Sequence, residues 1–114
     1  MKPDIIKFID KKYTAAPESL WRRYPTYCVF RHADNKKWFA LIGTISRHIL
    51  KLDGNGEIDF INLKTSDAEF FRGVRGILPA YHMNKNHWIT ILLDGTIPIK
   101  NIQNLIETSY ELTV

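Results

Sequence analysis

The chain has little of what disulfide-linked, exported or membrane-spanning proteins require. Cys28 is the single cysteine among 114 residues, so no internal disulfide can form, and residence in the cytoplasm is the default expectation. No apolar run approaches the roughly 20 residues needed to cross a bilayer. The first residues alternate charged and apolar side chains, unlike the continuous apolar region of a signal peptide. We therefore expect a cytoplasmic protein with no membrane segment.

Motifs for cofactors and catalysis are also missing. The glycine-containing segment 53–56 lacks the lysine of a nucleotide phosphate loop and the acidic ligands of a calcium loop. The four histidines and the cysteine do not have the spacing of a zinc site. Asp94 or Glu107 beside His87 would be a conceivable acid–base pair. We expect no enzymatic activity, no cofactor and no bound metal.

Charge is distributed unevenly along what the length suggests is a single domain. Residues 1–51 contain 11 Lys and Arg against 4 Asp and Glu, whereas residues 52–114 contain 5 against 8. A basic half can attract phosphate groups or an acidic partner. The other interpretation is solubility, because halves of a sequence need not be halves of a structure. The charge pattern alone leaves both interpretations open.

Hydrophobic spacing predicts a helix at each end of the chain. Apolar residues recur every three or four positions in residues 2–14 and again after Pro98, and proline suits the first turn of a helix. Residues 15–26 contain two prolines and are expected to form an irregular connection. Trp21 and Tyr24 would hold this connection against the core.

Between the helices, β-branched and aromatic residues predict five strands, at residues 27–32, 38–45, 58–63, 77–83 and 88–93. A helical turn at 46–50 would follow the second strand. A short helix at 67–72, capped by Ser66 with Glu69 and ended by Gly73, would follow the third. Pro79 indicates that the fourth strand lies at a sheet edge. The order α-β-β-β-α-β-β-α with hairpin connections predicts an α+β fold with an antiparallel sheet.

Two seven-residue segments, 32–38 and 82–88, look alike. Each begins with histidine, passes through Asn and Lys, and ends with a tryptophan that enters an expected strand. Lysine and asparagine at hairpin tips can contact phosphates, with histidine donating hydrogen bonds and tryptophan bracing the tip. The candidate DNA-contacting residues are Arg31, His32, Lys36, Lys37, Trp38, His82, Asn84, Lys85, His87 and Trp88.

A structural interpretation of these two segments competes with the functional one. Hairpin turns are commonly rich in Asn, Asp and Lys, and a tryptophan at a strand start commonly packs into the core. Asn84 can adopt left-handed geometry and bond its own backbone, so it can simply shape the turn. We favour core packing for Trp38 and Trp88, and regard the lysines as equally compatible with either interpretation.

The pattern Y-H-M-N-K-x-H-W-x-T from Tyr81, followed by L-D-G-x-x-P from Leu93, resembles the MmcQ/YjbR family of small bacterial proteins. The similarity covers most of the chain and is strongest over residues 76–113. It implies the same element order, in a layout shared with type III secretion chaperones and related to the frataxin-like CyaY shape. Family members are described as DNA-binding through a double-wing surface.

The resemblance leaves two functions to weigh. One is a non-enzymatic DNA-binding protein whose basic hairpin tips contact the phosphate backbone. The alternative is a protein-interaction or adaptor module of secretion-chaperone-like fold, with a protein partner and no role on nucleic acid. The frataxin-like shape also suggests iron, which depends there on an acidic ridge along the first helix. Here that helix carries Lys7, Lys11 and Lys12 against two aspartates, so iron is not expected.

Overall fold

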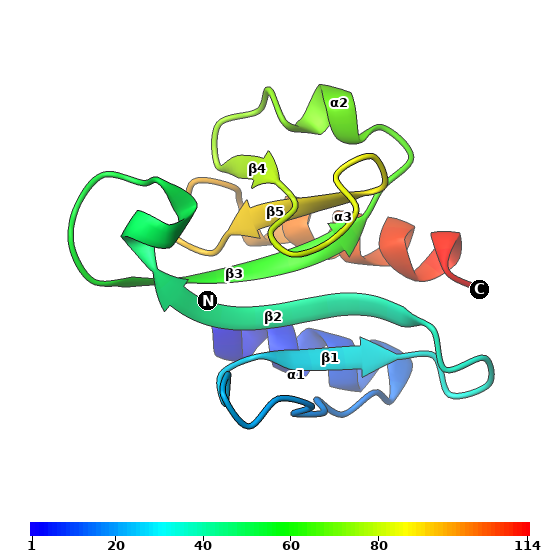
Figure 1. Ribbon diagram of the computed structural model, residues 1–114. Helices are drawn as coiled ribbons and strands as arrows, with labels where there is room; N and C mark the ends of the chain where they lie inside the picture. The colour runs from blue at the N-terminus through cyan, green and yellow to red at the C-terminus, as the bar shows by residue number, and fades with distance from the viewer.

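Two helices from the ends of the chain cover one face of a five-stranded antiparallel sheet in the computed structural model, which describes residues 1–114 (Figure 1). In chain order the elements are α1 (Lys2–Tyr13), β1 (Cys28–Arg31), β2 (Trp38–Ser46), the 3-10 helix η1 (Arg47–Leu50), β3 (Glu57–Lys64), α2 (Ala68–Phe71), β4 (Ile77–Pro79), β5 (Trp88–Leu92) and α3 (Ile99–Leu112). The predicted α+β class and element order are confirmed, and η1 is the helical turn expected at 46–50.

The strands lie in the order β1-β2-β3-β5-β4, and each neighbouring pair is antiparallel. β4 is therefore an edge strand, as Pro79 predicts. The prediction of a strand over 77–83 is wrong in length, because β4 ends at Pro79. At Tyr81 the backbone N–H and carbonyl bond to the side chains of Thr90 and Asn62 instead of continuing the ladder.

A β-bulge at Phe39 changes which residues of β2 point to which side. Arg31 pairs with Trp38 and Phe30 pairs with Ala40, so Phe39 has no partner in β1. The extra residue places both Phe39 and Ala40 in the core beneath the helices, while Trp38 packs on the opposite side of the sheet. Strict alternation along β2 would not have produced this arrangement.

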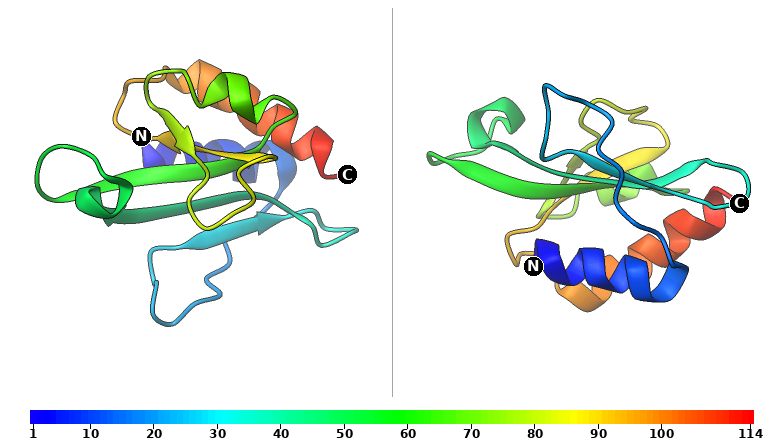
Figure 2. Two further views of the ribbon diagram at one scale, coloured as in Figure 1. Left: turned by 45° about the horizontal axis from the view of Figure 1, so that its top comes forward. Right: turned by 90° about the horizontal axis from the view of Figure 1, so that it is seen from below.

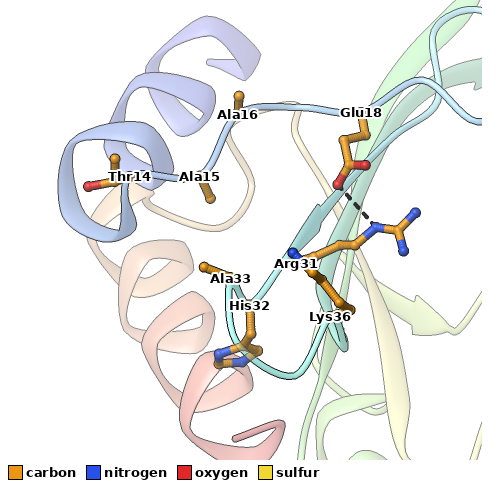
Figure 3. A pocket seen from close by; sticks show the side chains of 8 residues that line it. All are labelled: Thr14, Ala15, Ala16, Glu18, Arg31, His32, Ala33 and Lys36. Atoms are coloured by element: carbon orange, nitrogen blue, oxygen red, sulfur yellow. Dashed lines mark hydrogen bonds and ion pairs between the residues drawn. The ribbon is translucent and has the colours of Figure 1, made fainter.

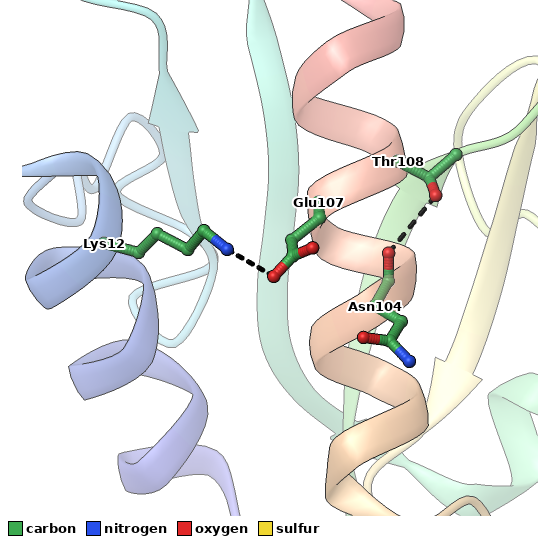
Figure 4. A network of polar contacts seen from close by, with 4 residues as sticks. All are labelled: Lys12, Asn104, Glu107 and Thr108. Atoms are coloured by element: carbon green, nitrogen blue, oxygen red, sulfur yellow. Dashed lines mark hydrogen bonds and ion pairs between the residues drawn. The ribbon is translucent and has the colours of Figure 1, made fainter.

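The face of the sheet covered by α1 and α3 holds the larger core (Figure 2). The fully buried apolar residues of the two helices are Ile5, Ile9, Ile102 and Ile106. Their spacing of four residues within each helix is the amphipathic pattern that predicts these helices. Lys12 of α1 and Glu107 of α3 form an ion pair that joins the two helices at the surface (Figure 4). Neither helix, nor any other in the protein, is long and apolar enough to cross a membrane.

The opposite face, which we call the open face, carries a second apolar cluster. Its buried members are Tyr27, Val29, Leu41, Ile45, Ile58, Phe60 and Leu92. No long helix covers this cluster, and instead the connections 15–26 and 80–87 lie over part of it (Figure 2). Trp21 and Tyr81 of those connections pack against it. The predicted role of Trp21 in holding the first connection to a core is confirmed.

The short helix α2 begins differently from the prediction. Asp67 is the N-cap, and its carboxylate accepts a hydrogen bond from the backbone N–H of Phe70 at 3.4 Å. The predicted capping box of Ser66 with Glu69 is therefore wrong by one residue. Gly73 has no left-handed backbone angle, so the predicted glycine cap at the end of this helix is also wrong. Ser and Asp are equally good N-caps, which is why the sequence did not distinguish them.

Candidate functional site

The connection between β1 and β2 presents two of the predicted lysines to solvent. The backbone N–H of His32 donates to the carbonyl of Lys37 at 3.0 Å, and that of Lys36 donates to the carbonyl of His32 at 3.1 Å, which closes the turn. Lys36 adopts a left-handed backbone angle, with φ of 64°. Lys36 and Lys37 are exposed and form no ion pair. Their ammonium groups are available to an external anion.

His32 is not part of this surface, contrary to the prediction. Its side chain is only 2% exposed. Its Nε2 lies 2.7 Å from the hydroxyl of Thr113, and its ring packs 4.0 Å from the ring of Tyr110. His32 therefore ties the turn to the end of α3. The sequence could not show this, because Thr113 lies far away along the chain.

Arg31 is one of the residues that line a depression of about 590 Å³ beside the same turn (Figure 3). The depression is lined by Thr14, Ala15, Ala16, Glu18, Arg31, His32, Ala33 and Lys36. Glu18 accepts a hydrogen bond from Nε of Arg31 at 3.0 Å. Because Glu18 already neutralises much of its charge, Arg31 is a weaker candidate for a phosphate contact than the lysines.

The connection 80–87 contains the other predicted residues. The side-chain oxygen of Asn84 accepts from the backbone N–H of Asn86 at 2.9 Å. The main-chain carbonyl of Asn84 accepts from Trp88 at 2.9 Å. These bonds support the structural interpretation, in which Asn84 shapes its own turn. His82, Lys85 and His87 are exposed, and Trp88 is half-buried at the start of β5.

The two connections lie at the same end of the sheet. β2 and β5 run in the same direction on either side of β3, and each begins with a tryptophan, Trp38 or Trp88. Two strand spacings, about 10 Å, separate these starts. The connections are not a matched pair of protruding hairpins, however. The first is a turn at the end of the sheet, whereas the second folds back over the open face (Figure 1).

A buried polar cluster that the sequence did not predict holds the second connection in place. The Thr90 hydroxyl donates to the side-chain oxygen of Asn62 at 2.5 Å and accepts from the backbone N–H of Tyr81 at 2.9 Å. The side-chain nitrogen of Asn62 donates to the carbonyl of Tyr81 at 2.8 Å. Asn62 and Thr90 are fully buried and directly opposite one another in β3 and β5. Together they fix both backbone groups of Tyr81.

Where the two connections 15–26 and 80–87 approach each other, the open face contains an aromatic pocket of about 280 Å³. Its lining residues are Trp21, Tyr24, Tyr27, Trp38, Leu41, Tyr81, His82 and Met83. The rings of Trp21 and Trp38 meet edge to face at 5.7 Å, and those of Tyr24 and Tyr27 stack at 4.9 Å. Among these residues only Trp38 and His82 were predicted as site residues, because aromatic residues in separate segments resemble ordinary core residues.

Gly43 makes room for Tyr27, one of the residues that line the pocket. A Cβ atom at this position would lie 2.7 Å from Cδ1 of Tyr27 and 3.1 Å from the ring of Phe60. The absent side chain lets the Tyr27 ring pack closely against β2 and meet Phe60 edge to face at 5.7 Å. Burial, and next the neighbouring Tyr81 hydroxyl, raise the pKa of Tyr27 above its ordinary value.

The segments that form the pocket walls are basic. Residues 19–27, 35–41 and 80–88 contain no Asp or Glu. Their cationic residues are Arg22, Arg23, Lys36, Lys37 and Lys85, all of them exposed. None of the five forms an ion pair within the protein. The surface around the aromatic pocket therefore combines apolar rings with unpaired positive charge.

The suggested acid–base pairs around His87 are not formed. Asp94 follows the far end of β5, about 17 Å along the strand from its start, and accepts from the backbone N–H of Thr96 at 3.0 Å. Burial opposes ionisation of Asp94, but this hydrogen bond and the charge of Arg47 outweigh it and lower its pKa. Glu107 is engaged with Lys12. No group of three or more His, Cys, Asp or Glu side chains is placed to hold a metal ion.

Comparison with solved structures finds the same fold elsewhere. A crystal structure of a protein from Pseudomonas syringae superposes with a TM-score of 0.96 at 42% identity, covering 100% of this chain and 99% of that one. A solution NMR structure from the same organism gives a TM-score of 0.88, with coverage of 100% and 93%. A Deinococcus radiodurans protein shares the fold at 24% identity, with a TM-score of 0.73, over 98% of this chain and 77% of that one.

Comparison with sequences gives the same result. The uncharacterized protein YyaQ of Bacillus subtilis (strain 168) is 46% identical over 114 residues, which span 98% of this chain and 97% of YyaQ. The uncharacterized protein YjbR of Escherichia coli (strain K12) is 40% identical over 57 residues, 47% of this chain and 48% of YjbR. The sequence model of the YjbR family matches residues 11–112. Fold, sequence and motif agree, and the chain belongs to the YjbR family.

Proposed function

We propose that this protein binds DNA without catalysing a reaction, through contacts between exposed cations at one end of the sheet and the phosphate backbone. The observation that carries the proposal is the group of unpaired cations around the starts of β2 and β5. Lys36, Lys37 and Lys85 are exposed and form no ion pair, although Asp34 lies in the same turn as the first two. An anion can bind there without displacing an internal ion pair.

The arrangement favours contacts to the backbone over reading of base edges. Lysine ammonium groups bind phosphates as point charges with little directional preference. Neither connection places a helix or an extended β-ribbon where it could enter a major groove, which is the usual route to base-specific contacts. Binding should therefore depend strongly on salt and weakly on duplex sequence.

One observation favours the alternative, a protein-interaction module. Large apolar side chains stand exposed along the connection 15–26 and η1, namely Leu20 at 41%, Tyr24 at 45% and Ile49 at 49%. Exposed apolar residues beside a groove are typical of surfaces that bind other proteins. Binding to such a partner would be driven by apolar burial and would be much less sensitive to salt than binding to DNA.

Fluorescence anisotropy of labelled duplex DNA at several salt concentrations tests the proposal. The variant Lys36→Gln/Lys37→Gln/Lys85→Gln removes the proposed contacts. The matched control Lys7→Gln/Lys11→Gln/Lys100→Gln removes the same formal charge from exposed positions on α1 and α3.

We expect affinity to fall with rising salt, and the slope of log affinity against log salt to shrink by about 2 to 3 in the first variant. The control variant should retain nearly the original slope. Equal losses in both variants would mean that only net charge matters and would contradict a defined surface. Absence of binding at low salt would refute DNA binding altogether.

A further inference from the structure

We propose that the aromatic pocket on the open face receives one unpaired nucleobase, so that the protein prefers single-stranded to double-stranded nucleic acid. This inference rests on the proposed function and adds to it the form of nucleic acid that is bound. The geometry that carries it is an apolar, ring-lined pocket whose three wall segments hold exposed cations and no carboxylate.

The pocket has the dimensions and lining for a single flat ring system. Its volume of about 280 Å³ lies just below the range typical of sites for drug-sized ligands. Seven of its eight lining residues are hydrophobic. It is therefore too small for a large cofactor, and its lining is mostly apolar.

Ring surfaces suitable for stacking are available. One face of the Tyr24 ring lies against Tyr27 at 4.9 Å, with an interplanar angle of 17°, yet the residue remains 45% exposed. Tyr24 thus keeps accessible surface that a base could contact. Trp21 and Trp38, perpendicular to one another at 89°, form a corner beside it. Stacking of bases on such aromatic side chains is the usual mode of recognising single strands.

Charge complementarity selects the kind of occupant. A flat apolar ring alone could come from a peptide or a small molecule, but a nucleobase is attached to a phosphate backbone. Arg22 and Arg23 lie between Trp21 and Tyr24 in the chain, Lys37 directly precedes Trp38, and Lys85 lies two residues after Met83. A base in the pocket would therefore have cations on the surrounding rim for its phosphates.

Single strands are favoured over duplexes because the pocket lies on the sheet face, between connections, and not on a protruding tip. A base pair within a duplex is stacked on both faces and cannot reach such a pocket without being flipped out, which costs energy. An unpaired base needs less energy to leave its neighbours and enter the pocket. His82, the one residue of the lining that is not hydrophobic, lies on the rim and is exposed, where it can donate a hydrogen bond to a base edge or a phosphate.

The experiment compares three labelled probes of about 12 nucleotides, a length within the range of single-strand binding sites. They are oligothymidylate, an abasic strand with the same backbone, and a duplex. Anisotropy gives the affinity for each probe. Intrinsic fluorescence reports whether a base stacks in the pocket, because two of the three tryptophans, Trp21 and Trp38, line it.

The test variant is Tyr24→Ala, which removes the most accessible stacking ring and little of the core. Its matched control is Phe70→Ala, which removes an aromatic side chain that is 63% exposed on α2 and outside the pocket. We expect oligothymidylate to bind more tightly than the other two probes and to quench tryptophan fluorescence. Tyr24→Ala should weaken its binding about tenfold while leaving the abasic probe unaffected. Phe70→Ala should change neither.

The outcomes separate this inference from the proposed function. Equal, salt-sensitive binding of all three probes would overturn the nucleobase pocket and leave phosphate contacts intact. Absence of binding to every probe would overturn both. Quenching by an acidic, aromatic-rich peptide but by none of the oligonucleotides would assign the pocket to a protein side chain and would also overturn the nucleobase proposal.

Discussion

Thr90 and Asn62 are the residues on which the shape of the aromatic pocket depends most directly, because they hold the backbone of Tyr81. We expect Thr90→Val to lower the free energy of unfolding by about 2 to 3 kcal/mol. The substitution leaves the backbone N–H of Tyr81 and the side-chain oxygen of Asn62 without their partner in a buried environment. Urea denaturation measures the loss.

The control for this prediction is Thr108→Val. The Thr108 hydroxyl donates only to the carbonyl of Asn104, one turn back on α3, at a more accessible position (Figure 4). A change within about 0.5 kcal/mol is expected there. If both variants lost the same stability, the Thr90 cluster would not be a special anchor of the connection 80–87.

Tyr13 should make stability depend on pH in the alkaline range. Burial, followed by the charge of Glu107, raises its pKa from 10.0 to about 12. A raised pKa in the folded state contributes stability that is complete below pH 10 and is lost as the pH rises through about 12. Tyr13→Phe should therefore lose less stability than the unsubstituted protein across this window, as measured by urea denaturation.

Within β2, the close packing of the strand against the open-face aromatics depends on Gly43. We expect Gly43→Ala to destabilise the protein by about 1 to 3 kcal/mol, because the new methyl group would overlap the Tyr27 ring. Displacement of Tyr27 should also alter the tryptophan emission of the pocket. Gly73→Ala is the matched control, since a Cβ there would meet only the carbonyl of Phe70 at 3.5 Å. Equal thermal stability of the two variants would contradict this role for Gly43.

The connection 80–87 shows why element boundaries were harder to predict than element types. Residues 80–83 continue the apolar character of β4, so the local pattern predicts a strand that is longer than the one in the structure. In the structure, side chains from two other strands take the hydrogen bonds of Tyr81 and turn the chain over the open face. The cap of α2 at Asp67 instead of Ser66 is a smaller error of the same kind, because neighbouring residues offered equivalent local bonding.

The C-terminal end of the chain and the β1–β2 turn form one connected unit. Thr113, which is 4% exposed, contacts His32 through its hydroxyl and accepts from the side chain of Asn35 at 3.0 Å through its carbonyl. We expect deletion of residues 113–114 to cost about 2 to 4 kcal/mol and to loosen the turn that carries Lys36 and Lys37. Deletion of Val114 alone, which is 73% exposed, should be nearly neutral. Similar unfolding midpoints for the two deletions would show that Thr113 does not brace the turn.

Helix and strand types, their order and the edge position of β4 follow from the sequence, because hydrophobic periodicity and proline act over a few neighbouring residues. The same local signals led to the family resemblance and to the exposed turn lysines. Burial of His32 by Thr113, the Asn62–Thr90 cluster and the assembly of the aromatic pocket were decided only by tertiary structure. Each joins residues from segments well separated in the chain, and only strand register and helix packing bring their side chains within bonding distance.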